Sequence, residues 1–173
     1  MEQPAVDDKD WTWILDEPCP ECGFDAAQVS GSDVAGIVDD ARHRFTVALT
    51  RPDAKQRPEP RTWSTLEYAC HVRDVNRIFT ERVELMLNND DPQFPNWDQD
   101  ETAVTDRYAE QIPSQVAAEL QVQFTDAARI FGSVQDEQWV RRGRRSNGSV
   151  FTVDSLGRYF AHDLVHHLHD ISA

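Results

Sequence analysis

Histidines are concentrated near the C-terminal end of the sequence. Four of the six lie within eight residues, at His162, His166, His167 and His169. In an α-helix, His162 and His166 are about 40° apart and one turn along the axis, so both imidazoles can reach one metal ion. His167 points away from that pair. A metal site also needs a third ligand from elsewhere in the chain. The alternative interpretation is that these histidines form an exposed polar face of the helix.

A third imidazole is available at His71. It falls among the apolar positions of a segment with helical periodicity, so we predict that it faces the core. A buried imidazole needs partners, and a histidine hydrogen-bonded to a carbonyl or a carboxylate is the alternative to a metal ligand. Together with the HxxxH pair, His71 makes three nitrogen ligands. This number suits zinc or another divalent metal with one coordination position left open.

The three cysteines do not form a disulfide framework, because their number is odd. Cys19 and Cys22 form a CPEC pair, which by itself is half of a zinc site or a redox dithiol. No second CxxC motif follows, so we interpret the pair as a turn with reduced cysteines, in an arm that can neighbour the cleft. Cys70 lies about 100° around the helix from His71 and is predicted to pack in the core.

Positive charge is dense only in residues 141–145, just before the last predicted helix. The four arginines there are candidates for binding an anionic group of a substrate. A solvated loop that balances the acidic residues 90–101 is the alternative. The arginines are Arg141, Arg142, Arg144 and Arg145.

Spaced apolar residues predict four long amphipathic helices that must position these side chains. A capping box of Ser64 and Glu67 marks the start of the second helix, Pro113 suits the first turn of the third, and Thr152 caps the fourth. The predicted helices span residues 34–51, 65–88, 113–134 and 153–173. A short helix is expected over residues 102–111.

The expected fold is therefore all-α, a single four-helix bundle over residues 32–173. Residues 1–31 are predicted to form an irregular N-terminal arm that packs on the bundle. The sequence RRGRRSNGS is predicted to be a turn-rich loop, and no pair of adjacent strands is predicted.

The composition of the 173-residue chain fits this single domain and excludes several classes of function. Its net charge of −14 disfavours nucleic acid and anionic lipid as partners. The mean hydropathy is −0.62, and no apolar run approaches the length needed to cross a bilayer. The first residues lack the features of a secretory signal, so a cytoplasmic location is expected.

Three segments carry a resemblance to a known family: WSTLEYACHVRDVNRIFTERVELML, PNWDQDETAVTDRYAEQ and FTVDSLGRYFAHDLVHHLHDI. Together they resemble the DinB superfamily, and within it the branch of mycothiol and bacillithiol S-transferases. The similarity spans residues 32–173. It implies an up-down-down-up bundle, often dimeric, with a metal ion at one end of an open cleft. The family's three-histidine triad assigns His71, His162 and His166 as ligands.

The resemblance also implies a function. A low-molecular-weight thiol similar to mycothiol would be transferred to an electrophilic substrate, with zinc as the expected metal and nickel or iron as alternatives. We expect Asp74, Asp163 or Asp170 to orient the imidazoles. A metal-dependent hydrolase and a metal-binding stress-response protein without turnover are the alternative functions. The expected partners are small molecules, and the resemblance allows a homodimer.

Overall fold

Four long helices form the framework of the protein. The computed structural model describes residues 10–173, so the first nine residues of the predicted arm lie outside the described part. A shorter helix, α3 (Gln99–Thr105), lies in the connection between the second and third long helices. The long helices are α1 (Val34–Ala48), α2 (Thr65–Asn88), α4 (Pro113–Ser133) and α5 (Val153–Asp170).

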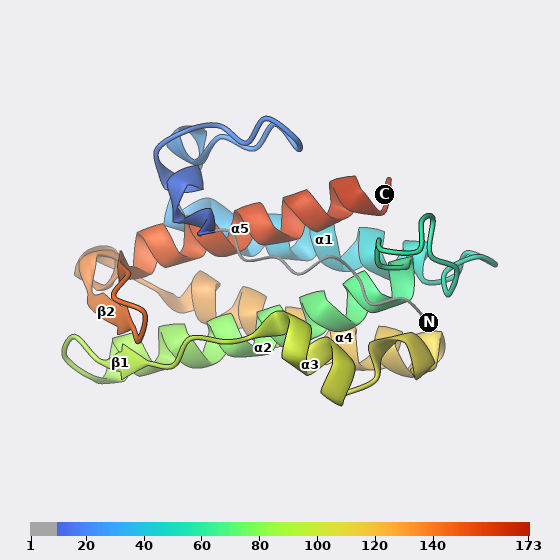
Figure 1. Cartoon of the computed structure of the whole chain (residues 1–173). Coiled ribbons are helices and arrows are strands. Elements are labelled where there is room, and N and C mark those ends of the chain that lie inside the picture. Colours follow the sequence, from blue (N-terminus) through green and yellow to red (C-terminus); the bar gives the residue numbers. More distant parts are fainter. Residues whose placement is uncertain (1–9) are drawn as a thin grey trace.

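The helices are arranged in an up-down-down-up order. Helices α1 and α5 run in one direction, and α2 and α4 run in the opposite direction (Figure 1). Each of α1 and α2 packs against both α4 and α5. Two long connections, residues 49–64 and 89–112, make this topology possible. The predicted bundle and its helix order are confirmed.

Local sequence signals explain where the helices begin. The side chain of Ser64 accepts a hydrogen bond from the Glu67 amide, and Thr152 caps α5 in the same way through Ser155. Pro113 occupies the first turn of α4, where its missing N–H has no partner to lose. These local rules account for the agreement between predicted and observed helix starts.

The core lies between the four long helices and is dominated by aromatic and aliphatic side chains. Helix α5 contributes a stripe with a spacing of four residues that is almost entirely withdrawn from solvent. Its members are Leu156, Phe160, Leu164 and Leu168. This stripe fixes the rotation of α5 about its own axis, and therefore the direction in which its polar side chains point.

A small three-stranded sheet differs from the prediction. Strand β2 (Arg142–Arg145) pairs in parallel with β1 (Gln93–Phe94) and antiparallel with β3 (Val150–Thr152). The loop expected at RRGRRSNGS is thus a β-hairpin, and its strands are too short to show an apolar alternation. A Cβ at Gly143 would lie 2.7 Å from the Met86 side chain, so glycine permits the close approach of β2 to α2.

The connection that follows β1 also differs from the prediction. The expected short helix over residues 102–111 is α3, which starts earlier, followed by a separate 3₁₀ turn at Tyr108–Glu110. Asp98 caps α3, because its side chain accepts a hydrogen bond from the Glu101 amide. Arg107 adopts a positive φ of 50°, which separates the two turns.

The described part of the arm lies over α5 (Figure 1). It consists of 3₁₀ turns at Trp11–Leu15, Ala26–Gln28 and Gly31–Asp33, all of which contact α5. The Gly31 amide donates to Asp154 Oδ1 at 2.7 Å. In residues 10–173, no helix combines the length and apolar character that a membrane span requires.

A buried ion pair joins the first long connection to α2. Arg57 Nε donates to Glu67 Oε2 at 2.9 Å, and the same oxygen accepts the Ser64 amide at 2.9 Å. Burial opposes ionisation of Glu67, but hydrogen bonds from Arg57 and Ser64 outweigh burial and lower the pKa of this carboxyl group. Glu67 therefore connects the loop of residues 49–64 to the N-terminal cap of α2.

We predict that Glu67→Ala lowers the free energy of unfolding by about 3 kcal/mol, because Arg57 loses its buried partner. The corresponding fall in Tm is about 10 °C. Because the pKa of Glu67 is lowered on folding, its contribution is present above the unfolded pKa and is lost as the pH falls through the folded value. Thermal unfolding of both proteins between neutral and acid pH measures the difference.

Glu110→Ala is the matched control. Glu110 faces Arg107 at 3.7 Å, and both side chains are largely exposed. Its Tm should stay close to that of the wild type at every pH. An equal loss of stability in the two variants would contradict the role given to Glu67.

Candidate metal centre

Helix α5 presents potential ligands on two faces. His162 and His166 face the arm, whereas Asp163 and His167 face α2. Each pair is separated by four residues, so its two side chains lie one above the other. The pairs point in directions about 100° apart, since they are offset by one residue. One metal ion cannot easily use both pairs.

His71 belongs with the second of these faces. Its ring lies 4.8 Å from that of His167, edge to face, and stacks on Trp97 at 5.4 Å with an interplanar angle of 9°. His71 is fully buried. Within residues 10–173, neither of its ring nitrogens has a hydrogen-bond partner. A buried polar group without a partner destabilises the folded state, so a bound ligand is expected to satisfy the ring nitrogens of His71.

The atoms of three side chains converge at this position, which we call the α2–α5 cluster (His71, Asp163 and His167). The Nε2 atoms of both histidines lie 3.7 Å from the same carboxylate oxygen, Asp163 Oδ1. That distance is too long for a hydrogen bond, and Oδ1 has no such partner within the described chain. Two nitrogens and one oxygen at about 2.0–2.2 Å from a divalent ion would be separated by slightly less. The donor set therefore fits a metal.

The protonation states also suit metal binding. Burial lowers the pKa of His71, which keeps its imidazole neutral at pH 7. Burial opposes ionisation of Asp163, but the neighbouring His167 and His71 outweigh it and lower the pKa of the carboxyl group to about 2. A neutral imidazole and an ionised carboxylate are the forms that bind a cation.

Asp170 orients His167. Its Oδ2 atom lies 2.8 Å from His167 Nδ1, one turn further along α5. Burial raises the pKa of Asp170, but the hydrogen bond and charge of His167 outweigh this effect and lower it. An ionised carboxylate can only accept, so the proton resides on Nδ1 and the lone pair of Nε2 points toward Asp163. The role of Asp170 in orienting a metal ligand stays a prediction.

A cavity of about 90 Å³ opens beside the cluster. Helix α5 lines it with Tyr159 and with the two pairs His162/His166 and Asp163/His167. Trp11 and Gln99 line it from other elements. Space of this size admits water and a small reacting group. The cavity gives the cluster access to a ligand from outside.

The structure does not bring the expected triad together. His162 and His166 lie side by side, with ring centroids 5.1 Å apart, but their neighbours are Cys19 and Cys22 of the arm. His71 belongs to the other group, with Asp163 and His167. Asp163, expected to orient an imidazole, lies in the same group as His71 and His167. The physical reason is the rotation of α5, which turns residues 163 and 167 toward α2.

Asp74 does not contact either histidine group through a hydrogen bond in the described chain. Its carboxylate accepts hydrogen bonds from the Tyr108 hydroxyl and the Arg73 guanidinium. Burial raises the pKa of the Tyr108 hydroxyl, which keeps it protonated as a donor. Asp74 therefore anchors the second long connection to α2.

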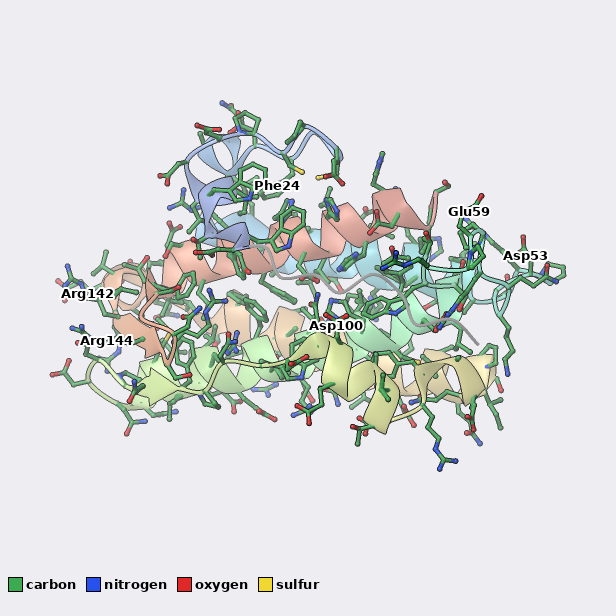
Figure 2. All side chains as sticks on the ribbon, in the orientation of Figure 1. Phe24, Asp53, Glu59, Asp100, Arg142 and Arg144 are labelled. Carbon is green, nitrogen blue, oxygen red and sulfur yellow. The ribbon has the colours of Figure 1, made fainter. Side chains whose placement is uncertain are left out.

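Three of the four arginines in residues 141–145 form hydrogen bonds within the protein. Arg141 donates to the carbonyl oxygens of Met86 and Asn89, and Arg144 pairs with Asp91 at 2.6 Å. Figure 2 shows Arg142 and Arg144 at one end of the bundle, pointing away from it. The Arg145 guanidinium lies 6.0 Å from the ring of Tyr159, one of the residues that line the cavity. A substrate-binding role for the four stays a prediction.

Sequence reasoning missed His167, although a signal for it was present. On a helical projection, residues 163 and 167 lie about 40–80° from the centre of the apolar stripe of α5, whereas 162 and 166 lie nearly opposite it. A residue beside the stripe is better placed to meet another helix than one opposite it. The DxxxH spacing therefore marks the side chains that reach α2.

The fold and the cluster together define a class of protein: α-helical bundles that can hold a divalent ion between two helices. The family model of the DinB superfamily matches residues 38–171. Since this match covers most of the sequence, the chain belongs to the DinB superfamily. The S-transferase branch within it stays a prediction.

A solved structure shares the fold. YfiT from Bacillus subtilis, described as a probable metal-dependent hydrolase with an unusual four-helix bundle topology, superposes with a TM-score of 0.72. The two chains are 17% identical, and the alignment covers 88% of each. At this identity the likeness shows the fold alone. No curated protein matches the sequence.

We predict that Asp163→Asn greatly weakens metal binding at the α2–α5 cluster, because a neutral amide is a poor replacement for a charged oxygen ligand. The loss should exceed the roughly 10–100-fold cost of removing a residue that only orients a ligand. Competition with a chromogenic zinc chelator measures the affinity.

Asp126→Asn serves as the control, since Asp126 is an exposed partner of Arg129 on α4. It should leave zinc affinity unchanged. Unaltered affinity in Asp163→Asn would show that the cluster is not a metal site.

Proposed function

We propose that the chain is a metal-dependent hydrolase whose ion is bound by the α2–α5 cluster. The observation that carries this proposal is the convergence of two imidazole nitrogens on Asp163 Oδ1 next to a cavity. Two histidines and one carboxylate form a ligand set used by zinc hydrolases, which leaves a coordination position for water. Zinc is the metal we propose, with nickel and iron as alternatives.

A divalent ion held by His71, Asp163 and His167 would supply a Lewis acid able to activate water and polarise a substrate carbonyl. The residues of the chain do the remaining work. Asp170 holds the His167 ring so that Nε2 faces the ligand position. Trp97 stacks on one face of His71 and shields that face of the imidazole from water.

Tyr159 is the candidate for binding the reacting group. It lines the cavity one helical turn before Asp163. Burial raises the pKa of its hydroxyl, so the group remains a hydrogen-bond donor at neutral pH. A donor fixed beside a Lewis acid stabilises the charge that develops on a carbonyl oxygen during hydrolysis.

We expect the zinc-loaded protein to hydrolyse members of a panel of small esters and amides without added thiol. The turnover should be lost in Asp163→Asn, which lacks one ligand, and retained in the Asp126→Asn control. Product formation followed by chromatography gives the rate. If none of the panel is hydrolysed by protein with a full complement of zinc, the hydrolase proposal fails.

Thiol transfer is the second candidate, favoured by the resemblance of three segments to the S-transferase branch. An open coordination position accepts a sulfur atom as well as an oxygen atom, and a bound thiol is held as the nucleophilic thiolate. The same assay separates the two reactions. Thiol transfer predicts consumption of an electrophile only when a low-molecular-weight thiol is present.

We predict that Tyr159→Phe lowers kcat by about 100-fold, because one donor to the developing charge is removed. Zinc content and Tm should remain those of the wild type, since the phenyl ring keeps its packing against Phe79 and Phe151. Steady-state kinetics with the best substrate of the panel checks this. A rise in KM with unchanged kcat would instead assign Tyr159 to ground-state binding.

A further inference from the structure

A second group of potential ligands lies between the arm and α5. We call it the arm–α5 cluster, and its members are Cys19, Cys22, His162 and His166. One ligand atom from each lies within 4.8 Å of those of the others. We propose that this cluster is a structural zinc site, separate from the α2–α5 cluster, that fastens the N-terminal arm to the last helix.

The distances fit a tetrahedral ion. Cys19 Sγ lies 3.6 Å from His166 Nδ1. With Zn–S and Zn–N bonds of about 2.3 and 2.0–2.1 Å, a sulfur and a nitrogen on one tetrahedral ion are separated by about 3.6 Å. The remaining donors are close enough for small side-chain rotations to complete the set.

Burial explains why these side chains need a shared ligand. Cys19 is 1% exposed, His162 4% and His166 7%. His162 Nε2 has no hydrogen-bond partner among residues 10–173. Cys19 and Cys22 form no disulfide. A zinc ion would satisfy the orphaned nitrogen of His162 and neutralise two thiolates in a largely buried position.

The CPEC loop is shaped to present both sulfur atoms to the same point. The Gly23 amide donates to Cys19 O at 2.9 Å, and the Cys19 amide donates to Phe24 O at 2.8 Å. Gly23 has a φ of 76°, a conformation that favours glycine and reverses the chain directly after Cys22. Burial raises the pKa of the Cys22 thiol, and the Phe24 amide opposes this by stabilising the thiolate.

Surrounding groups hold the imidazoles in place. His166 Nε2 faces carboxylate oxygens of Glu21 at 3.6 Å and Asp170 at 3.9 Å, which leaves Nδ1 toward Cys19. The ring of Phe24 packs edge to face on His162 at 5.6 Å. Figure 2 shows Phe24 between the arm and α5. These contacts would restrict each ring to the orientation that binding requires.

The ligand count assigns this site a structural role. Four protein ligands fill a tetrahedral zinc ion, so no position remains for a substrate. The α2–α5 cluster, by contrast, supplies only three ligands and leaves a position open toward the cavity that both clusters border. Trp11 links the two, because it packs on His166 at 5.1 Å and also lines the cavity. The arm–α5 cluster would therefore fix one wall of the candidate active site.

Metal stoichiometry tests the proposal independently of activity. Protein produced without a polyhistidine tag and loaded with zinc should retain two ions per chain after gel filtration. The double variant Cys19→Ser/Cys22→Ser should retain one, and so should Asp163→Asn, because each removes a different site. Cys70→Ala is the matched control and should retain two, since Cys70 lies in the core beside Gln111.

Cobalt substitution identifies which site is lost. Wild type and Asp163→Asn should both show the near-ultraviolet charge-transfer absorption of a thiolate bound to cobalt, and the double serine variant should lack it. A single zinc ion in the wild type without this band would overturn the proposal. Retention of the band by the double serine variant would also overturn it.

A measurement on the wild type covers the case in which the serine variant does not fold. In the zinc-loaded protein, Cys19 and Cys22 should react slowly with a thiol reagent. When a chelator removes the metal, the number of rapidly reacting thiols should rise by two. Thiol reactivity that does not change on chelation would overturn the proposal. A disulfide between the two cysteines in the zinc-loaded protein would also overturn it and assign a redox dithiol instead.

Discussion

The period of the α-helix is the constraint on which the rest of the candidate site depends. The core stripe of Leu156, Phe160 and Leu164 fixes the rotation of α5, and every polar group on that helix then has a determined direction. Two adjacent pairs with the same spacing of four residues diverge as a result, so they must find different partners. One pair meets α2, and the other meets the arm.

This arrangement makes α5 the centre of the chemistry as well as part of the core. Asp163 and His167 are joined by a histidine from α2, whereas His162 and His166 are covered by cysteines and aromatic rings of the arm. Elements that are distant in the sequence cover both groups and reduce their exposure to solvent. The supporting carboxylate of Asp170 lies near both, since it contacts His167 and faces His166.

The sequence was informative where structure is determined locally. Caps such as Ser64 and Thr152 and the spacing of apolar residues identified the long helices, because these signals act within one or two turns. The grouping of His71 with Asp163 depends instead on how two helices rotate against each other. The contact of Cys19 with His166 joins residues 147 positions apart, and no local pattern encodes such a pairing. The short strands escaped detection for a similar reason, because their pairing is non-local.

The contact between the CPEC loop and the last helix has a consequence for biosynthesis. Cys19 leaves the ribosome long before His162 and His166 have been translated. The N-terminal arm can therefore make these contacts only after the last helix has been synthesised. Any cross-link formed there closes a loop that contains nearly the whole polypeptide, and the entropy lost by the unfolded chain grows with the length of such a loop. Assembly of this corner is thus tied to completion of the protein, and a chain truncated before α5 would keep its two N-terminal thiols exposed to oxidation.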